Sequence, residues 1–134
     1  MSDDSLQPGA GSESPENLPA DLSAAVAAIE DRKGEDPLVL DVRGIASFTD
    51  YIIMCSGGSE RHVQAIADAV VDQLREQGLK PLHIEGYEQA SWILVDYVDF
   101  LVNVFTRETR DFYHLERVWR DAPVVVGNRE SAPD

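Results

Sequence analysis

A glycine turn is the first place in this sequence where chemistry could reside. The tetrapeptide Ser56-Gly57-Gly58-Ser59 follows an apolar run and precedes a stretch with helical spacing. Its backbone N–H groups would therefore lie at a helix N-terminus, an arrangement that suits phosphate. The glycine spacing matches neither the dinucleotide nor the Walker fingerprint. Because a tight strand-to-helix turn also requires glycine, a structural role is the favoured interpretation.

Two carboxylates could complete a nucleotidyl-transfer site with that turn, by holding the metal ions that clamp a triphosphate. Asp96 and Asp99 are three positions apart, and an odd separation on a strand places side chains on opposite faces. They converge only if the loop between them folds them together, and Asp is common at turn ends for other reasons. The sequence favours a turn here, and a nucleotidyltransferase-like enzyme stays open as the alternative.

Other reactive side chains lack the neighbours that catalysis or metal binding needs. Cys55 lies in an apolar run, where a thiol is usually inert packing, and Ser59 is explained as a helix cap. The histidines share no spacing typical of zinc ligands: His62, His83 and His114. We therefore expect no catalytic residue, no cofactor and no metal site.

Aromatic residues in the last third of the chain alternate with acidic ones, a composition that suits a protein-binding face. We expect Phe112 and Trp119 to be core residues, whereas Trp92 and Tyr113 are harder to place wholly inside. The aromatic members are Tyr87, Trp92, Tyr97, Phe112, Tyr113 and Trp119.

Composition limits the class of protein that the 134 residues can form. A 43% apolar fraction builds one core, the single cysteine excludes an internal disulfide, and no run reaches the roughly 18 apolar residues of a membrane span. The polar N-terminus lacks the features of a secretory signal, so we expect a cytoplasmic protein without membrane contact. The net charge of −14 disfavours direct binding to nucleic acid and favours basic protein partners.

The elements that must position these residues indicate an α/β domain. We expect a disordered acidic tail over residues 1–17, a folded domain over 18–122, and a flexible tail over 123–134. The order of elements predicts a mixed five-stranded sheet flanked by helices. The expected helices cover 19–33, 59–77 and 108–118, and the expected strands cover 38–42, 51–55, 81–86, 92–95 and 100–105.

Several segments, in this order, resemble the ribosomal silencing factor family, also called the Iojap family. The similarity covers about residues 20–122. Its main segments are 40–44 (LDVRG), 47–51 (SFTDY), 55–57 (CSG), 61–68 (RHVQAIAD), 92–96 (WILVD) and 110–119 (RDFYHLERVW).

The resemblance implies a cytoplasmic factor that docks on a protein at the joining face of the large ribosomal subunit, blocks the small subunit, and damps translation when nutrients fall. It also implies a nucleotidyltransferase-like fold without demonstrated catalysis, and a homodimer in the free state. A role in large-subunit maturation is an alternative that shares the same surface. Gly58, Val98 and Asn103 depart from the family pattern, where Thr, Gly and His are usual.

We therefore expect one face of the domain to bind a basic ribosomal protein, with Trp92 as a buried anchor and acidic residues as a steering rim. The residues expected to form it are Trp92, Ile93, Asp96, Tyr97, Asp99, Tyr113 and Glu116.

Overall fold

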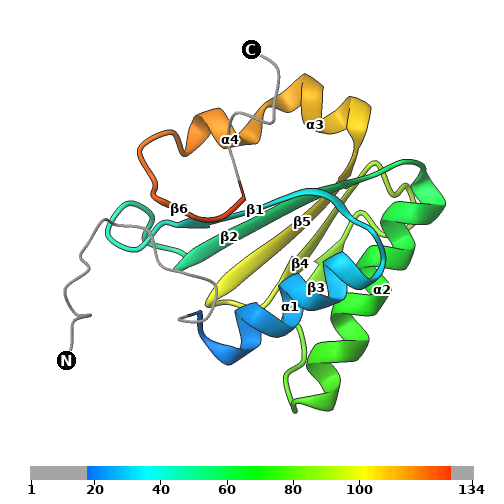
Figure 1. Cartoon of the computed structure of the whole chain (residues 1–134), viewed down its shortest axis with the longest axis horizontal. Helices are drawn as coiled ribbons and strands as arrows, with labels where there is room; N and C mark the ends of the chain where they lie inside the picture. The colour runs from blue at the N-terminus through cyan, green and yellow to red at the C-terminus, as the bar shows by residue number, and fades with distance from the viewer. Residues whose placement is uncertain (1–17, 128–134) are drawn as a thin grey trace.

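A computed structural model describes residues 18–127. The tail predicted over 1–17 and residues 128–134 of the tail predicted over 123–134 lie outside this part of the chain. The described residues form one mixed sheet with helices on both sides (Figure 1). The helices are α1 (Ala20–Asp31), α2 (Glu60–Glu76), α3 (Arg107–Tyr113) and α4 (Leu115–Val118). The strands are β1 (Glu35–Asp41), β2 (Tyr51–Gly57), β3 (His83–Glu85), β4 (Trp92–Asp96), β5 (Phe100–Thr106) and β6 (Val124–Val126).

The sheet has six strands in the order β3-β4-β5-β2-β1-β6, so the predicted mixed α/β sheet is confirmed and the predicted count of five is wrong. The added strand, β6, pairs with β1 and lies in a segment that we expected to be a flexible tail. Its three valines favour a strand, but only the free edge of β1 gives them a pairing partner. The two strands at the centre, β2 and β5, run parallel, and the other pairs are antiparallel.

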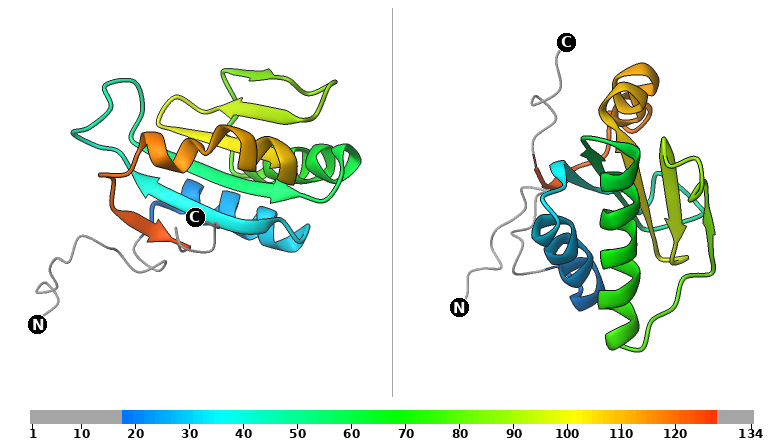
Figure 2. Two further views of the ribbon diagram at one scale, coloured as in Figure 1. Left: turned by 90° about the horizontal axis from the view of Figure 1, so that it is seen from above. Right: turned by 90° about the vertical axis from the view of Figure 1, so that its right-hand side faces the viewer.

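One face of the sheet is covered by the two longer helices, α1 and α2. Apolar residues of α2 recur at helical spacing, and Ser59 caps the helix by accepting a hydrogen bond from the His62 N–H at 3.0 Å. Gly78 follows the helix with a φ of 84°, as its sequence position predicts. Since both helices pack against the same side, this face forms the larger core, which we call the closed face (Figure 2, right).

The opposite face is covered over only part of its width. The helices α3 and α4 and the segment that leads to β6 lie across β1, β2 and β5, where a second core cluster includes Leu40, Met54 and Phe105. Seen from this side, the hairpin of β3 and β4 extends beyond the helices (Figure 2, left). We call this uncovered part the open face.

The last helix differs from the prediction, because it is broken in two. His114 adopts a left-handed conformation with a φ of 50°, and its N–H donates to the carbonyl of Arg110 at 2.9 Å. The break turns the chain, so the helical spacing that predicted a core position for Phe112 does not hold, and Phe112 is 77% exposed. Trp119, on the far side of the break, packs partly against the second core cluster.

The turn between β4 and β5 forms with the unusual residue in place. Val98 adopts a φ of 73°, a region that a β-branched residue enters only at a cost. Two hydrogen bonds to Val98 help to hold this turn: the Val98 N–H donates to Asp96 Oδ1 at 2.8 Å, and the Thr49 hydroxyl donates to the Val98 carbonyl at 2.9 Å. Tertiary contacts therefore stabilise a conformation that the residue type disfavours.

Candidate partner-binding surface

The open face is built by the alternation of side chains along β4 and β5. Trp92, Leu94 and Asp96 point to the side away from α1 and α2, and they pair across the strands with Phe105, Asn103 and Leu101. We define the open face by its exposed or half-exposed members, which are His83, Glu85, Trp92, Leu94, Asp96, Leu101 and Tyr113.

Leu94 and Leu101 are the apolar centre of the open face. Both side chains are half-exposed, and neither packs against either core cluster. Their neighbours along the strands, Val95 and Val102, are fully buried on the closed face. Adjacent residues of one strand therefore lie on two different faces of the sheet. Among the described residues, no helix covers the part of the face that carries Leu94 and Leu101.

Trp92 is held in a fixed orientation at the edge of this face. Its indole N–H donates to Asn103 Oδ1 at 2.9 Å, and Asn103 in turn donates to the carbonyl of Ile53 at 3.3 Å. The indole also contacts the rings of Phe105 and Tyr113, with centroid distances of 5.1 and 5.4 Å. A large side chain that is ordered before binding loses little entropy on binding, which suits an anchor.

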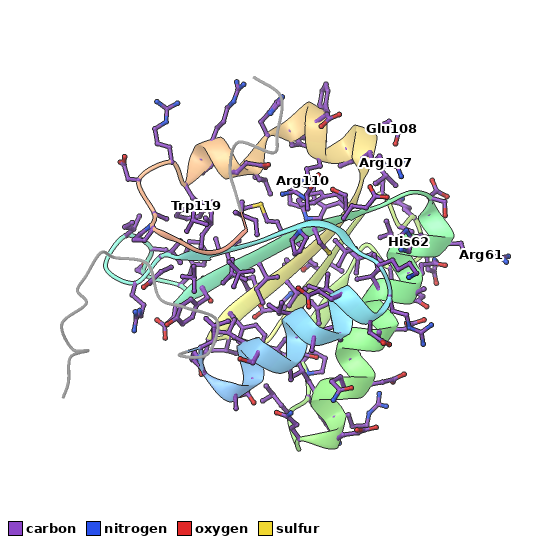
Figure 3. All side chains as sticks on the ribbon, in the orientation of Figure 1. Arg61, His62, Arg107, Glu108, Arg110 and Trp119 are labelled. Carbon is purple, nitrogen blue, oxygen red and sulfur yellow. The ribbon has the colours of Figure 1, made fainter. Side chains whose placement is uncertain are left out.

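A buried arginine fixes α3 and thereby Tyr113. Arg110 reaches from α3 down to the sheet (Figure 3), where it donates to Ser56 Oγ at 3.1 Å and to the carbonyl of Asp36 at 2.9 Å. It also forms a buried ion pair with Glu116, at 3.3 Å. The sequence analysis missed Arg110, because the segment around it is rich in charged residues and gives no local signal of burial.

The structure separates the seven residues that were expected to form one binding face. Ile93 is fully buried on the closed face, and Tyr97 also lies in that core with 4% exposure. Glu116 is buried against Arg110 and so has a structural role. Strand alternation and the helix break turn these three residues inward, so they do not form part of an exposed face as expected. Trp92, Asp96 and Tyr113 remain together on the open face.

The acidic rim is narrower than expected. Asp96 is half-buried, accepts a hydrogen bond from the Val98 N–H, and lies 3.7 Å from a ring nitrogen of His83. Glu85 forms a 3.0 Å contact with the other ring nitrogen. Asp99 is exposed, but it sits on the turn beyond the end of β4.

The glycine turn and the carboxylates of the enzyme alternative lie at opposite ends of the sheet. The turn includes the last two residues of β2, whereas the Asp99 carbonyl accepts hydrogen bonds from the N–H groups of Asp50 and Tyr51 at the beginning of that strand. Seven strand residues at about 3.3 Å each separate the two by about 20 Å. Two groups so far apart do not act together on one triphosphate.

The polar groups of the glycine turn are already in use. Ser56 accepts from Arg110, Ser59 caps α2, and the Gly58 N–H donates to His62 Nδ1 at 2.9 Å. Nearby, Arg107 makes two contacts with the Glu35 carboxylate, at 2.6 and 2.5 Å, and these hydrogen bonds hold the pKa of Glu35 below its usual value.

Residues 18–127 offer few other groups that could carry chemistry. Burial raises the pKa of the Cys55 thiol to about 12, so the nucleophilic thiolate is strongly disfavoured. In this range no three His, Cys, Asp or Glu side chains gather as a metal site would require. None of the helices described has the length and apolar content that crossing a bilayer demands.

Residues 15–134 of this chain match the protein-family model described as "Ribosomal silencing factor during starvation". A Bacillus subtilis protein named ribosomal silencing factor RsfS is 43% identical over 104 residues, which cover 78% of this chain and 88% of that protein. A mouse protein named "Mitochondrial assembly of ribosomal large subunit protein 1" is 28% identical over 102 residues, which cover 74% of this chain and 45% of that protein.

Two solved structures are similar to this chain in both sequence and fold. A crystal structure from Bacillus halodurans is 41% identical and superposes with a TM-score of 0.70, covering 78% of this chain and 95% of that one. A second, from Chromobacterium violaceum, is 36% identical with a TM-score of 0.73 and covers 75% and 83%.

Proposed function

This chain belongs to the ribosomal silencing factor family, and from that premise we propose that it binds a basic protein on the joining face of the large ribosomal subunit and sterically blocks the small subunit. The protein would repress translation in the cytoplasm when nutrients are limiting. It acts by occupying a surface, without turning over a substrate.

The observation that carries this proposal is the open face. It offers partly exposed Leu94 and Leu101 beside an oriented Trp92, which is the pattern of an apolar centre with an aromatic anchor. A standard interface buries about 800 Å² on each partner, an area within reach of so small a domain. The contact set that we now propose is Trp92, Leu94, Asp96, Leu101 and Tyr113, with Glu85 and Asp99 toward its rim.

Charge supports a basic partner. The chain carries 25 acidic and 11 basic side chains, and three carboxylates lie on or near the open face, those of Glu85, Asp96 and Asp99. An acidic domain is repelled by bare nucleic acid and is steered toward basic proteins, a long-range effect that raises the association rate at low salt.

The direct test is sucrose-gradient sedimentation of purified ribosomal subunits with the protein. We expect the protein to migrate with large subunits and the fraction of joined ribosomes to fall. Losing one hot spot of about 2 kcal/mol weakens binding about thirtyfold, so Trp92→Ala should remove both effects. Absence of the wild-type protein from every ribosomal fraction contradicts the proposal.

A matched pair of variants tests the surface itself. Leu94→Lys places a charge on the open face, and Leu82→Lys places the same charge on another exposed leucine near β3. Only the first should weaken large-subunit binding, by tenfold or more, because an unpaired charge must be buried in the interface. Equal binding by the two variants would move the site elsewhere. Thermal unfolding of both variants checks that the fold is intact.

A homodimer in the free state is part of the proposal, with the open face covered by a second copy until the ribosome replaces it. Sedimentation equilibrium measures this directly. Leu94→Lys should shift a dimer toward monomer, whereas Leu82→Lys should not.

Maturation of the large subunit is the second candidate function, and the name of the mouse relative favours it. The two roles share a surface and differ in outcome. Depleting a maturation factor leaves incomplete large subunits, whereas depleting a silencing factor leaves complete subunits that join too readily during starvation. Gradient profiles of depleted cells in growth and in starvation separate the two.

A further inference from the structure

A small pocket opens where α1 begins, beside the turn that joins β4 to β5. Its volume is about 160 Å³. Besides aliphatic side chains, its lining contains three carboxylates and three aromatic rings, which are those of Asp21, Asp50, Asp99, Tyr51, Tyr97 and Phe100.

The pocket wall is held together by hydrogen bonds between distant parts of the chain. The N–H groups of Asp50 and Tyr51 donate to the carbonyl of Asp99, at 3.0 and 3.3 Å. The Thr49 hydroxyl donates to the carbonyl of Val98 beside them. These contacts keep the backbones of Asp50 and Asp99 together, so two negative side chains are fixed at one wall despite the repulsion between them.

Tyr97 supplies a second and independent feature. It lines the pocket and is 4% exposed, and its hydroxyl has no hydrogen-bond partner among the described residues. The ring is stacked on Phe100 with a centroid distance of 5.0 Å, which limits its freedom to move into water. An unpartnered buried hydroxyl is rare and costs free energy, unless a bound group completes its hydrogen bonding.

The charge around the pocket is negative. Among the described residues no Lys or Arg lines it. Arg43 lies over the Tyr51 ring and pairs with Asp41, and Arg75 acts electrostatically on Tyr97 from outside the lining. The N-terminus of α1 contributes roughly half a positive charge, which offsets only a fraction of the three carboxylates. A cation is therefore the ligand class that the pocket favours.

We propose that this pocket binds an alkylammonium group, such as the end of a lysine side chain or of a free polyamine. Carboxylates would pair with the ammonium, the rings would contact it through their faces, and the Tyr97 hydroxyl oxygen would accept one of its N–H bonds. The size fits, because 160 Å³ holds about five waters at roughly 30 Å³ each and is smaller than the pockets of about 300 Å³ or more that hold drug-sized ligands.

The first experiment titrates the full chain with n-butylammonium chloride, followed by amide chemical shifts in NMR. We expect saturable shifts at Leu22, Asp50 and Asp99. The double variant Asp50→Asn with Asp99→Asn should weaken the affinity at least tenfold. Its control, Asp31→Asn with Asp36→Asn, removes the same charge beyond the other end of α1 and should change the affinity less than twofold. Equal affinity in the two double variants overturns the proposal, because it would indicate diffuse attraction to an acidic protein.

Tyr97→Phe tests the hydroxyl separately from the charges. We expect weaker butylammonium binding with a thermal midpoint that is unchanged or higher, because the hydroxyl that is removed has no partner in the free protein. Unchanged affinity together with a lower midpoint would contradict the role of the hydroxyl and indicate ordinary packing.

Two sources of the ammonium group are then distinguished, and only the first rests on the proposed function. If a lysine of the ribosomal partner fills the pocket, the single variant Asp50→Asn, which leaves the proposed contact set intact, also binds large subunits more weakly. If a free polyamine fills it, Asp50→Asn binds large subunits normally and loses affinity for spermidine. Trp92→Ala should keep butylammonium binding in both cases. Failure of wild type to bind large subunits, with butylammonium binding intact, would remove only the proposed function.

Discussion

The two faces of the sheet are made from the same strands but end in different environments. On the closed face, Ile93 and Val95 are fully buried beneath α2, whereas Trp92 and Leu94 on the other side stay partly exposed. One face is filled by the chain itself, and the other has an apolar centre without a cover among the described residues. The difference shows that apolar character alone does not separate core from interface, because both faces have it.

The largest expected effect comes from the buried ion pair that holds α3 over the sheet. Arg110→Met breaks the buried ion pair with Glu116, and we expect a loss of about 3–5 kcal/mol in the free energy of unfolding. Urea denaturation measures it. Adding Glu116→Leu should recover most of the loss, since no uncompensated charge remains. A single variant as stable as wild type would mean that α3 is not fixed by this pair.

Two neighbouring residues of β4 give the sharpest comparison of the faces. Ile93→Ala removes fully buried volume and should cost about 2–5 kcal/mol of unfolding free energy. Leu94→Ala removes a half-exposed side chain and should cost about 1 kcal/mol or less, while weakening large-subunit binding. Urea denaturation and sedimentation measure the two effects. Both are measured at a protein concentration where the chain is monomeric, and equal losses of stability there would contradict the difference between the two faces.

The hydrogen bond between Trp92 and Asn103 tests whether the open face is ordered before binding. Asn103→Leu removes the acceptor of the indole N–H and the donor to the Ile53 carbonyl, and it should cost about 1–3 kcal/mol of stability, because two hydrogen bonds are lost inside the sheet. Trp92 should also become more mobile, which fluorescence anisotropy in a Trp119→Phe background reports. Large-subunit affinity should fall by several-fold. Unchanged affinity would mean that the indole orients itself on binding.

The smallest effect is a pH dependence at the exposed pair of Glu35 and Arg107. The hydrogen bonds from Arg107 lower the pKa of Glu35 from 4.5, so the stabilisation is present above about pH 4.5 and is lost as the pH falls through the lowered value. Because the Arg107 side chain is largely exposed, we expect less than about 1 kcal/mol. Glu35→Gln should flatten the stability profile below pH 4.5 and leave large-subunit binding unchanged.

Much of the fold could be predicted from local patterns. Helical spacing, the Ser59 cap and Gly78 located α2, and the apolar runs located the five predicted strands, which correspond to β1 to β5. Two elements could not be found in this way. The strand β6 exists only because β1 offers it an edge, and the helix break at His114 follows the buried contacts of Arg110. Neither cause is local in sequence.

The candidate site, like the fold, follows partly from local sequence patterns and partly from tertiary packing. Alternation along a strand already separates Trp92 from Ile93, and Asp96 from Tyr97, so the sequence by itself determined which residues share a face. It also determined the acidic charge and the ordered motifs that resemble one family. Only the tertiary structure decided which face α1 and α2 cover, because burial depends on what packs over a strand. The proposed interface is therefore the part of the sheet that residues 18–127 leave uncovered.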